Sequence, residues 1–176
     1  MKPARLNSIN SFRFVITVLI TMSLMSVDAE QKPSTQVDYT IYLIRHAEKE
    51  SGTDDPGLTN KGKERAKSLV KFFADKNLQN IYSTNYKRTF QTALPVAKQL
   101  SLDVNYYNPR ELQAFSKQLL SKKENTLIVG HSNTTPLLIK YLSGKSVAAI
   151  NENQHNRLFQ ITIKSSDVEL IELDMD

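Results

Sequence analysis

Two arginines and two histidines stand where apolar runs of the sequence give way to polar residues. Arg45 and His46 follow one such run directly, Arg88 comes a few residues after a second, and His131 ends a third. Guanidinium groups bind two phosphate oxygens at once and keep their charge at any relevant pH. Histidine titrates near neutrality, so one imidazole is free to attack phosphorus while another donates. These residue types supply the alignment and charge neutralisation that phosphoryl transfer needs, without a metal.

Distant parts of the chain must meet if these residues are to act together. Runs rich in β-branched and aromatic residues alternate with amphipathic patterns, with turn-forming residues between them. This alternation predicts an α/β fold, a three-layer sandwich whose mainly parallel central sheet is flanked by helices, with a hairpin at the end of the chain. The expected strands cover 39–44, 80–83, 102–107, 126–131, 157–163 and 168–175, and the expected helices follow Thr59 and cover about 86–100, 109–122 and 135–143.

The carboxyl ends of three expected strands carry the four candidate residues. In open α/β sheets, ligands bind in the crevice outside the carboxyl ends of the strands. We therefore expect Arg45, His46, Arg88 and His131 to surround a single hole the size of a phosphoryl group. The remaining histidine, His155, lies in the polar stretch "NENQHNR" and is interpreted as an exposed loop residue.

Length, charge and cysteine content narrow the class of protein. The chain has 176 residues, a length typical of one domain, and contains no cysteine. The absence of cysteine excludes thiol nucleophiles, disulfides and the zinc deaminase reading of "HAE", which needs a P-C-x-x-C partner. Net charge is +5 but no long Lys/Arg run occurs, so nucleic-acid binding is not indicated.

The N-terminal segment has the three-part pattern of a secretory signal peptide. Lys2, Arg5 and Arg13 form a basic region, residues 14–27 are uncharged and apolar, and cleavage is expected after Ala29. An uncleaved membrane anchor is the alternative, but the apolar run is shorter than the roughly 20 residues that span a bilayer. We therefore expect a periplasmic or secreted protein with no stable membrane anchor after cleavage.

Four ordered segments carry a resemblance to a known family. "LIRHAEK" looks like the arginine-histidine signature of the histidine phosphatase superfamily, also called phosphoglycerate mutase-like. "GLTNKGKERAKSL" is similar to the loop and helix after that signature, "YSTNYKRTFQTA" to the segment with the second arginine, and "VGHSNTTP" to the segment with the second histidine. On this resemblance the chain is a compact bacterial exported member, with a signal peptide at 1–29 and a histidine phosphatase domain at 30–176.

The resemblance implies a covalent mechanism. His46 would be the nucleophile that forms a phosphohistidine, Arg45 and Arg88 would hold the phosphoryl oxygens, and His131 would stabilise the charge of the transition state. No cofactor and no metal are implied, and the substrate would be a small phosphomonoester, for example an envelope sugar phosphate. A phosphohistidine protein phosphatase and a non-catalytic phosphate-binding module are the alternatives, and the oligomeric state stays open.

The sequence leaves the proton donor for the leaving group undecided. Larger relatives place a glutamate after the third strand, and Glu111 is the nearest match, although a glutamate in the first turn of a helix also favours the helix by itself. Asp54 and Asp55 are further candidates. Three positions depart from the family pattern: Ala47 stands where glycine is usual after the nucleophile, Thr84 where proline is frequent and Thr89 where a small residue is frequent.

Overall fold

The computed structural model describes residues 38–175. The expected signal peptide and the boundary near residue 30 lie outside the described residues. Within the described part, no helix is long and apolar enough to cross a membrane. Ten elements follow one another: β1 (Tyr39–Arg45), α1 (Asn60–Phe73), β2 (Asn80–Ser83), α2 (Lys87–Leu100), β3 (Val104–Tyr106), α3 (Leu112–Lys122), β4 (Thr126–Gly130), α4 (Thr134–Ser143), β5 (Arg157–Ile163) and β6 (Val168–Asp174).

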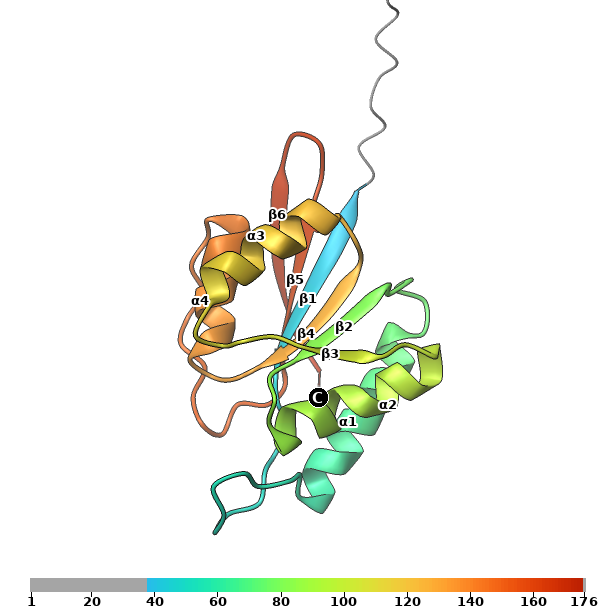
Figure 1. The fold of residues 1–176 in the computed structure, drawn as a ribbon, viewed down its shortest axis with the longest axis vertical. Coiled ribbons are helices and arrows are strands. Elements are labelled where there is room, and N and C mark those ends of the chain that lie inside the picture. Colours follow the sequence, from blue (N-terminus) through green and yellow to red (C-terminus); the bar gives the residue numbers. More distant parts are fainter. Residues whose placement is uncertain (1–37, 176) are drawn as a thin grey trace, which may run out of the picture. The chain divides into compact units, whose positions relative to one another are not determined.

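The six strands form one mixed sheet in the order β3-β2-β4-β1-β5-β6. The β3-β2, β2-β4 and β4-β1 pairs are parallel, whereas β5 pairs antiparallel with both β1 and β6. Figure 1 shows β1 and β4 near the middle of the sheet, with the β5–β6 hairpin at one edge. The prediction of an α/β sandwich with a mainly parallel sheet and a closing hairpin is confirmed.

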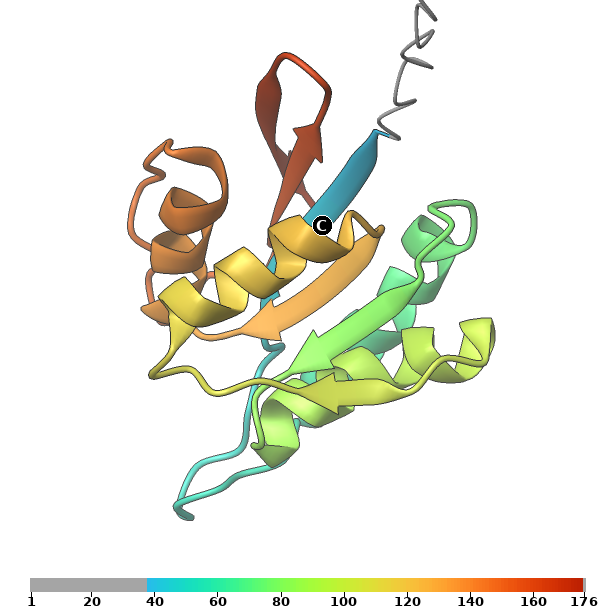
Figure 2. The same ribbon diagram turned by 45° about the horizontal axis from the view of Figure 1, so that its top comes forward.

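The sheet is covered on both faces, and the alternation of side chains along β1 explains why. Ile41 and Leu43 belong to the core under α3 and α4, whereas Tyr42 and Ile44 belong to the core under α1 and α2. Successive side chains of a strand point to opposite faces, so a central strand buried on both faces reads as a continuous apolar run. Figures 1 and 2 show the two helix pairs on opposite sides of the sheet.

The parallel topology sets where the candidate residues lie. The carboxyl ends of β1, β2 and β4 reach the same edge of the sheet, and the register pairs Arg45 with Gly130 and Ser83 with Val129. Segments that are far apart in sequence therefore emerge side by side, as the view in Figure 2 shows. The chain after each of these strand ends builds the site.

Candidate active site

A cavity of about 520 Å³ opens at this edge of the sheet. It brings together all four residues that the sequence singles out, from three different strand ends. Most of its other polar groups are cations or short polar side chains of the loops. Its lining consists of Arg45, His46, Lys49, Tyr86, Arg88, Pro109, Arg110, His131, Ser132, Asn133, Thr134 and Glu152.

His46 is held by its backbone and by one ring nitrogen. Its backbone N–H donates to the Gly130 carbonyl at 3.0 Å, and its Nδ1 lies 2.8 Å from the Ala47 carbonyl. A carbonyl only accepts, so Nδ1 carries the proton and Nε2 keeps its lone pair. Burial, together with the positive charges of Arg45 and Arg88, lowers the pKa of His46 to about 3. The ring is therefore neutral near pH 7, with an unprotonated nitrogen available as a nucleophile.

Arg45 is buried and its distal nitrogens are fixed by the loop before β5. Nη1 donates to the carbonyls of Asn151 and Glu152 at 2.7 Å each, and Nη2 contacts the Glu152 carboxylate at 2.7 Å. The Glu152 carboxylate also accepts from the Ser132 hydroxyl at 2.9 Å. In contrast, the Nε of Arg45 is buried and has no hydrogen-bond partner among the described residues. A buried N–H without a partner is costly, so an incoming oxygen at this place would be stabilised.

Arg88, in the first turn of α2, resembles Arg45 in its unpaired Nε. Its guanidinium lies over the ring of Tyr86, 4.4 Å from the ring centroid, and Nη1 is 3.8 Å from the Asp55 carboxylate. Its Nε is also buried with no partner within the described part of the chain. Arg45 and Arg88 both line the cavity, and a guanidinium N–H without a partner is a suitable donor to an anion.

The ring of His131 lies close to the rings of His46 and Tyr86. Its ring centroid lies 5.6 Å from that of His46 and 5.3 Å from that of Tyr86. Nε2 is 2.9 Å from the hydroxyl of Thr84. Burial, with the charges of Arg88 and Arg45, lowers the pKa of His131 to about 4. Both imidazoles that the sequence singled out are thus neutral near pH 7.

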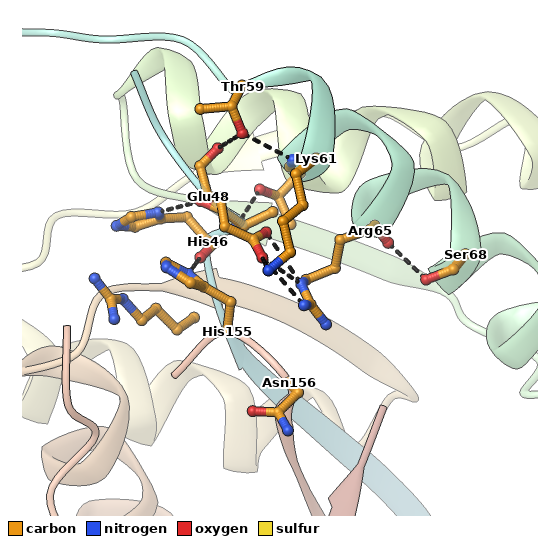
Figure 3. A network of polar contacts seen from close by, with 12 residues as sticks. His46, Glu48, Thr59, Lys61, Arg65, Ser68, His155 and Asn156 are labelled. Carbon is orange, nitrogen blue, oxygen red and sulfur yellow. Dashed lines mark hydrogen bonds and ion pairs between the residues drawn. The ribbon is translucent and has the colours of Figure 1, made fainter. Parts of the chain in front are cut away.

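The prediction that His155 is an exposed loop residue is right about the loop but wrong about the exposure. Its side chain is half-buried, its Nδ1 donates to the His46 carbonyl at 2.8 Å, and its ring centroid is 5.9 Å from that of His46. Figure 3 shows His155 directed at the backbone of His46. The contact spans 109 residues of sequence, and no local signal in a polar stretch distinguishes such a histidine from an exposed one.

The loop after β1 is fixed to α1 by the carboxylate of Glu48. Its carboxylate binds Arg65 through Nε and Nη2 at 3.0 to 3.2 Å, and Lys61 at 3.3 Å. Figure 3 shows this network running from His46 to α1. Because Arg65 belongs to α1, the contact holds the segment that begins with His46 against that helix. Thr59, the expected start of that helix, accepts from the backbone N–H of Gly62 as its cap.

The candidate proton donors lie apart from the cavity lining. Glu111 precedes α3 and lines a neighbouring pocket with Tyr106 and Tyr107. Asp55 accepts from the Lys87 backbone N–H at 3.0 Å, close to Arg88. The carboxylate that does line the cavity is Glu152, and its bond to Ser132 and the charge of Arg45 lower its pKa. No sequence signal pointed to Glu152, because its place depends on how the loop packs against Arg45.

The lowered histidine pKa values predict a pH dependence of stability. An unfolded histidine titrates near 6.5, so between pH 6.5 and about 3 the unfolded state takes up a proton that folded His46 does not. The free energy of unfolding should fall with decreasing pH in this window, by up to about 1.4 kcal/mol per pH unit for His46. Urea unfolding measures the free energy of unfolding at each pH. The range from pH 7 to 5 is chosen because most carboxylates titrate below it. A free energy that does not change over this range would contradict the neutral, buried state of His46.

Comparison with known proteins agrees with this geometry. Residues 41–111 match the model of the histidine phosphatase superfamily (branch 1). Phosphoserine phosphatase 1 of Hydrogenobacter thermophilus is 39% identical over 71 residues, which are 36% of this chain and 34% of that protein. Human 6-phosphofructo-2-kinase/fructose-2,6-bisphosphatase 4 is 43% identical over 61 residues, 31% of this chain and 13% of that protein. The match thus spans about a third or less of these curated relatives.

Solved structures share the fold over a larger part of the chain. The protein histidine phosphatase SixA, solved with tungstate, has a TM-score of 0.64 at 14% identity and covers 77% of this chain and 96% of its own. The mycobacterial glucosyl-3-phosphoglycerate phosphatase has a TM-score of 0.63 at 11% identity, covering 78% and 98%. The sequence match to the histidine phosphatase superfamily is thus confined to residues 41–111, and over most of its length the chain shares the fold of these solved phosphatases.

Proposed function

We propose that this protein is a phosphoric monoester hydrolase that forms a phosphohistidine on His46. One observation carries the proposal: the unpaired Nε groups of Arg45 and Arg88 and the neutral ring of His46 belong to residues that line the same cavity. The guanidinium N–H groups bind phosphoryl oxygens and neutralise their charge, and His46 Nε2 attacks phosphorus in line with the leaving oxygen. The Ala47 carbonyl holds the Nδ1 proton and so stabilises the positive charge that the phosphorylated ring develops.

The proposed substrate is a small phosphomonoester that meets the protein outside the cytoplasm. Support for the location comes from the signal-peptide pattern of the sequence, and an envelope sugar phosphate is one compound class found there. The relatives support the chemistry in general terms, since their names include phosphatases of phosphoserine and of glucosyl-3-phosphoglycerate. The cations Lys49 and Arg110 in the cavity lining suit a substrate with net negative charge.

A trapping experiment tests the proposal. The mature chain from Glu30 is incubated briefly with ³²P-labelled phosphomonoester, quenched in alkali and isolated. The expected result is a phosphoprotein that is stable in alkali and labile in acid, as phosphohistidine is. A protein that binds phosphate tightly but yields no adduct and no turnover would be a binding module, and the proposal would fail.

A phosphohistidine protein phosphatase is the second candidate function. The observation that favours it is the state of the cavity carboxylate: Glu152 is bound to Arg45 and Ser132, and its lowered pKa disfavours the protonated form that a general acid needs. A general acid is typically worth about 10²–10⁴-fold for a poor leaving group, whereas an imidazole leaves without such help. Faster turnover of a phosphohistidine peptide than of an alkyl phosphate would favour this candidate, and the reverse order would favour the sugar phosphate.

A further inference from the structure

The peptide bond between His46 and Ala47 is held from both sides by side chains that are distant in sequence. Its N–H, which belongs to Ala47, donates to the hydroxyl of Thr92 at 3.0 Å. Its carbonyl, which belongs to His46, accepts from Nδ1 of His155 at 2.8 Å (Figure 3). The N–H and the carbonyl of a trans peptide point in opposite directions, so these two bonds together fix the orientation of the peptide plane.

Thr92 connects this peptide to the first turn of α2. An amide N–H only donates, so the Thr92 oxygen accepts from Ala47 and its own proton is available for a second bond. The second bond goes to the carbonyl of Arg88 at 2.7 Å. A carbonyl oxygen has two lone pairs, so it accepts this hydroxyl as well as an N–H of the helix. One hydroxyl therefore joins the segment that carries His46 to the helix that carries Arg88.

The surroundings of this hydroxyl are closed to water. Thr92 and Ala47 are each 1% exposed, so without the hydroxyl the N–H of Ala47 would be a buried donor with no solvent to replace its partner. The methyl group of Ala47 is buried together with Leu58 and Ala66. Hydrogen bonding and packing thus hold the backbone at Ala47 in one conformation.

This backbone conformation decides what the ring of His46 contacts. The next carbonyl along the chain, that of Ala47, accepts from Nδ1 of His46 at 2.8 Å. Its direction depends on the orientation of the peptide plane that Thr92 holds. If that plane rotated, the carbonyl would turn away from the ring, and the proton would be shared between the two ring nitrogens. The held peptide keeps the proton on Nδ1 and the lone pair on Nε2.

We propose that Thr92 is a positioning residue for the nucleophile, a role that rests on the proposed function. By fixing the peptide plane after His46, its hydroxyl keeps the Ala47 carbonyl against Nδ1, so that the lone pair of Nε2 faces phosphorus. Its bond to the Arg88 carbonyl holds the same segment beside an arginine of the proposed phosphate site. Thr92 is not part of the cavity lining, so it acts through His46 and not by touching the substrate.

Nuclear magnetic resonance tests this positioning without a substrate. Imidazole ¹⁵N spectra of the histidine-labelled protein at pH 7 show which ring nitrogen is protonated, and the His46→Gln spectrum assigns the signals of His46. The wild-type protein should have a protonated Nδ1 and an unprotonated Nε2. In Thr92→Val the two ¹⁵N shifts should approach each other, and Thr92→Ser should restore the wild-type shifts. Identical His46 shifts in the wild-type protein and the valine variant would overturn the proposal.

Kinetics separates positioning from binding. Thr92→Val leaves the Ala47 N–H buried and unpaired, so kcat for a phosphomonoester should fall about ten- to hundredfold. Thr92→Ser keeps the hydroxyl and should restore kcat to within about threefold. Binding of inorganic phosphate, measured by its protection against thermal unfolding, should stay within about threefold in both variants. Parallel loss of kcat and phosphate binding would mean that Thr92 only supports the fold of the cavity, and would contradict the proposal.

A matched control separates this role from general damage to the core. Thr126 is also a buried threonine, but it lies at the opposite end of β4 from the cavity and its hydroxyl donates to the Glu124 carbonyl. Thr126→Val makes the same chemical change and should leave kcat within about twofold. An equal fall of kcat in both valine variants would count against a specific role of Thr92.

Two further outcomes are distinguishable. If Thr92→Val does not fold, Thr92→Ala removes the same hydroxyl with a smaller side chain, and the same shifts and rates are expected of it. If the wild-type protein forms no phosphoenzyme and turns over no phosphomonoester, the proposed function fails. The ¹⁵N spectra still decide whether Thr92 holds the ring of His46 in one protonation state.

Discussion

His46→Ala is expected to lower kcat/KM for any phosphomonoester by about 10⁴-fold or more. The variant removes Nε2, the atom proposed to form the covalent intermediate, while the guanidinium groups proposed to bind phosphate stay in the cavity lining. Binding of inorganic phosphate or vanadate should therefore persist. Steady-state kinetics combined with titration of vanadate, followed by its protection against thermal unfolding, measures both properties on the same sample.

The third histidine provides the control for this variant. His155→Gln removes a neighbouring imidazole whose ring centroid is 5.9 Å from that of His46, but which does not line the cavity. Its contact is with the carbonyl of His46, so its loss should affect the reaction less than about tenfold. If His46→Ala retained more than about one hundredth of the wild-type activity, another nucleophile would have to act.

The sequence predicted the framework of the site because the framework depends on local patterns. β2 has the predicted bounds, and β4 and α2 differ from them by a single residue at one end. β-branched runs fix strands, and the parallel order of β1, β4 and β2 carries their ends to one edge. For this reason local patterns are enough to assign residues as far apart as His46 and His131 to one cavity, where both are found.

The sequence could not predict contacts that depend on how loops pack. Glu152 and His155 come from one polar loop and reach Arg45 and His46 across more than 100 residues of sequence. Their residue types are ordinary for an exposed loop, and nothing in periodicity or spacing marks them. The start of α3 was also placed too early, because Asn108 accepts from the backbone N–H of Arg110 and holds this segment as a turn ahead of the helix.

The same limit applies to protonation states. A sequence identifies a histidine but does not say which of its nitrogens carries the proton. For His46 a neighbour decides this, because the Ala47 carbonyl beside Nδ1 can only accept a hydrogen bond. The family resemblance gave the two histidines different roles, His46 as nucleophile and His131 as the group that stabilises the charge of the transition state, and both roles stay predictions.

Arg88→Lys is expected to lower kcat/KM by about 10²–10³-fold, even though it keeps the positive charge. The buried Nε of Arg88 is one of the two unpaired donors on which the proposed phosphate site rests, and lysine has no counterpart for it. A lysine ammonium is a compact point charge, so it neutralises the phosphoryl group but does not reproduce the planar pair of N–H groups. Loss of one such donor to a developing charge typically costs this much in rate.

Arg157→Lys is the matched control, because Arg157 makes a two-pronged ion pair with Glu172 away from the cavity. It should keep activity within about twofold while it weakens that ion pair. Comparing kcat and KM separates two cases for Arg88. A rise in KM alone would mean that Arg88 binds the ground state and the transition state equally, whereas a fall in kcat means that its Nε bond strengthens as charge develops. Because Nε is buried without a partner among the described residues, and Arg88 lines the same cavity as His46, the proposed nucleophile, the fall in kcat should dominate.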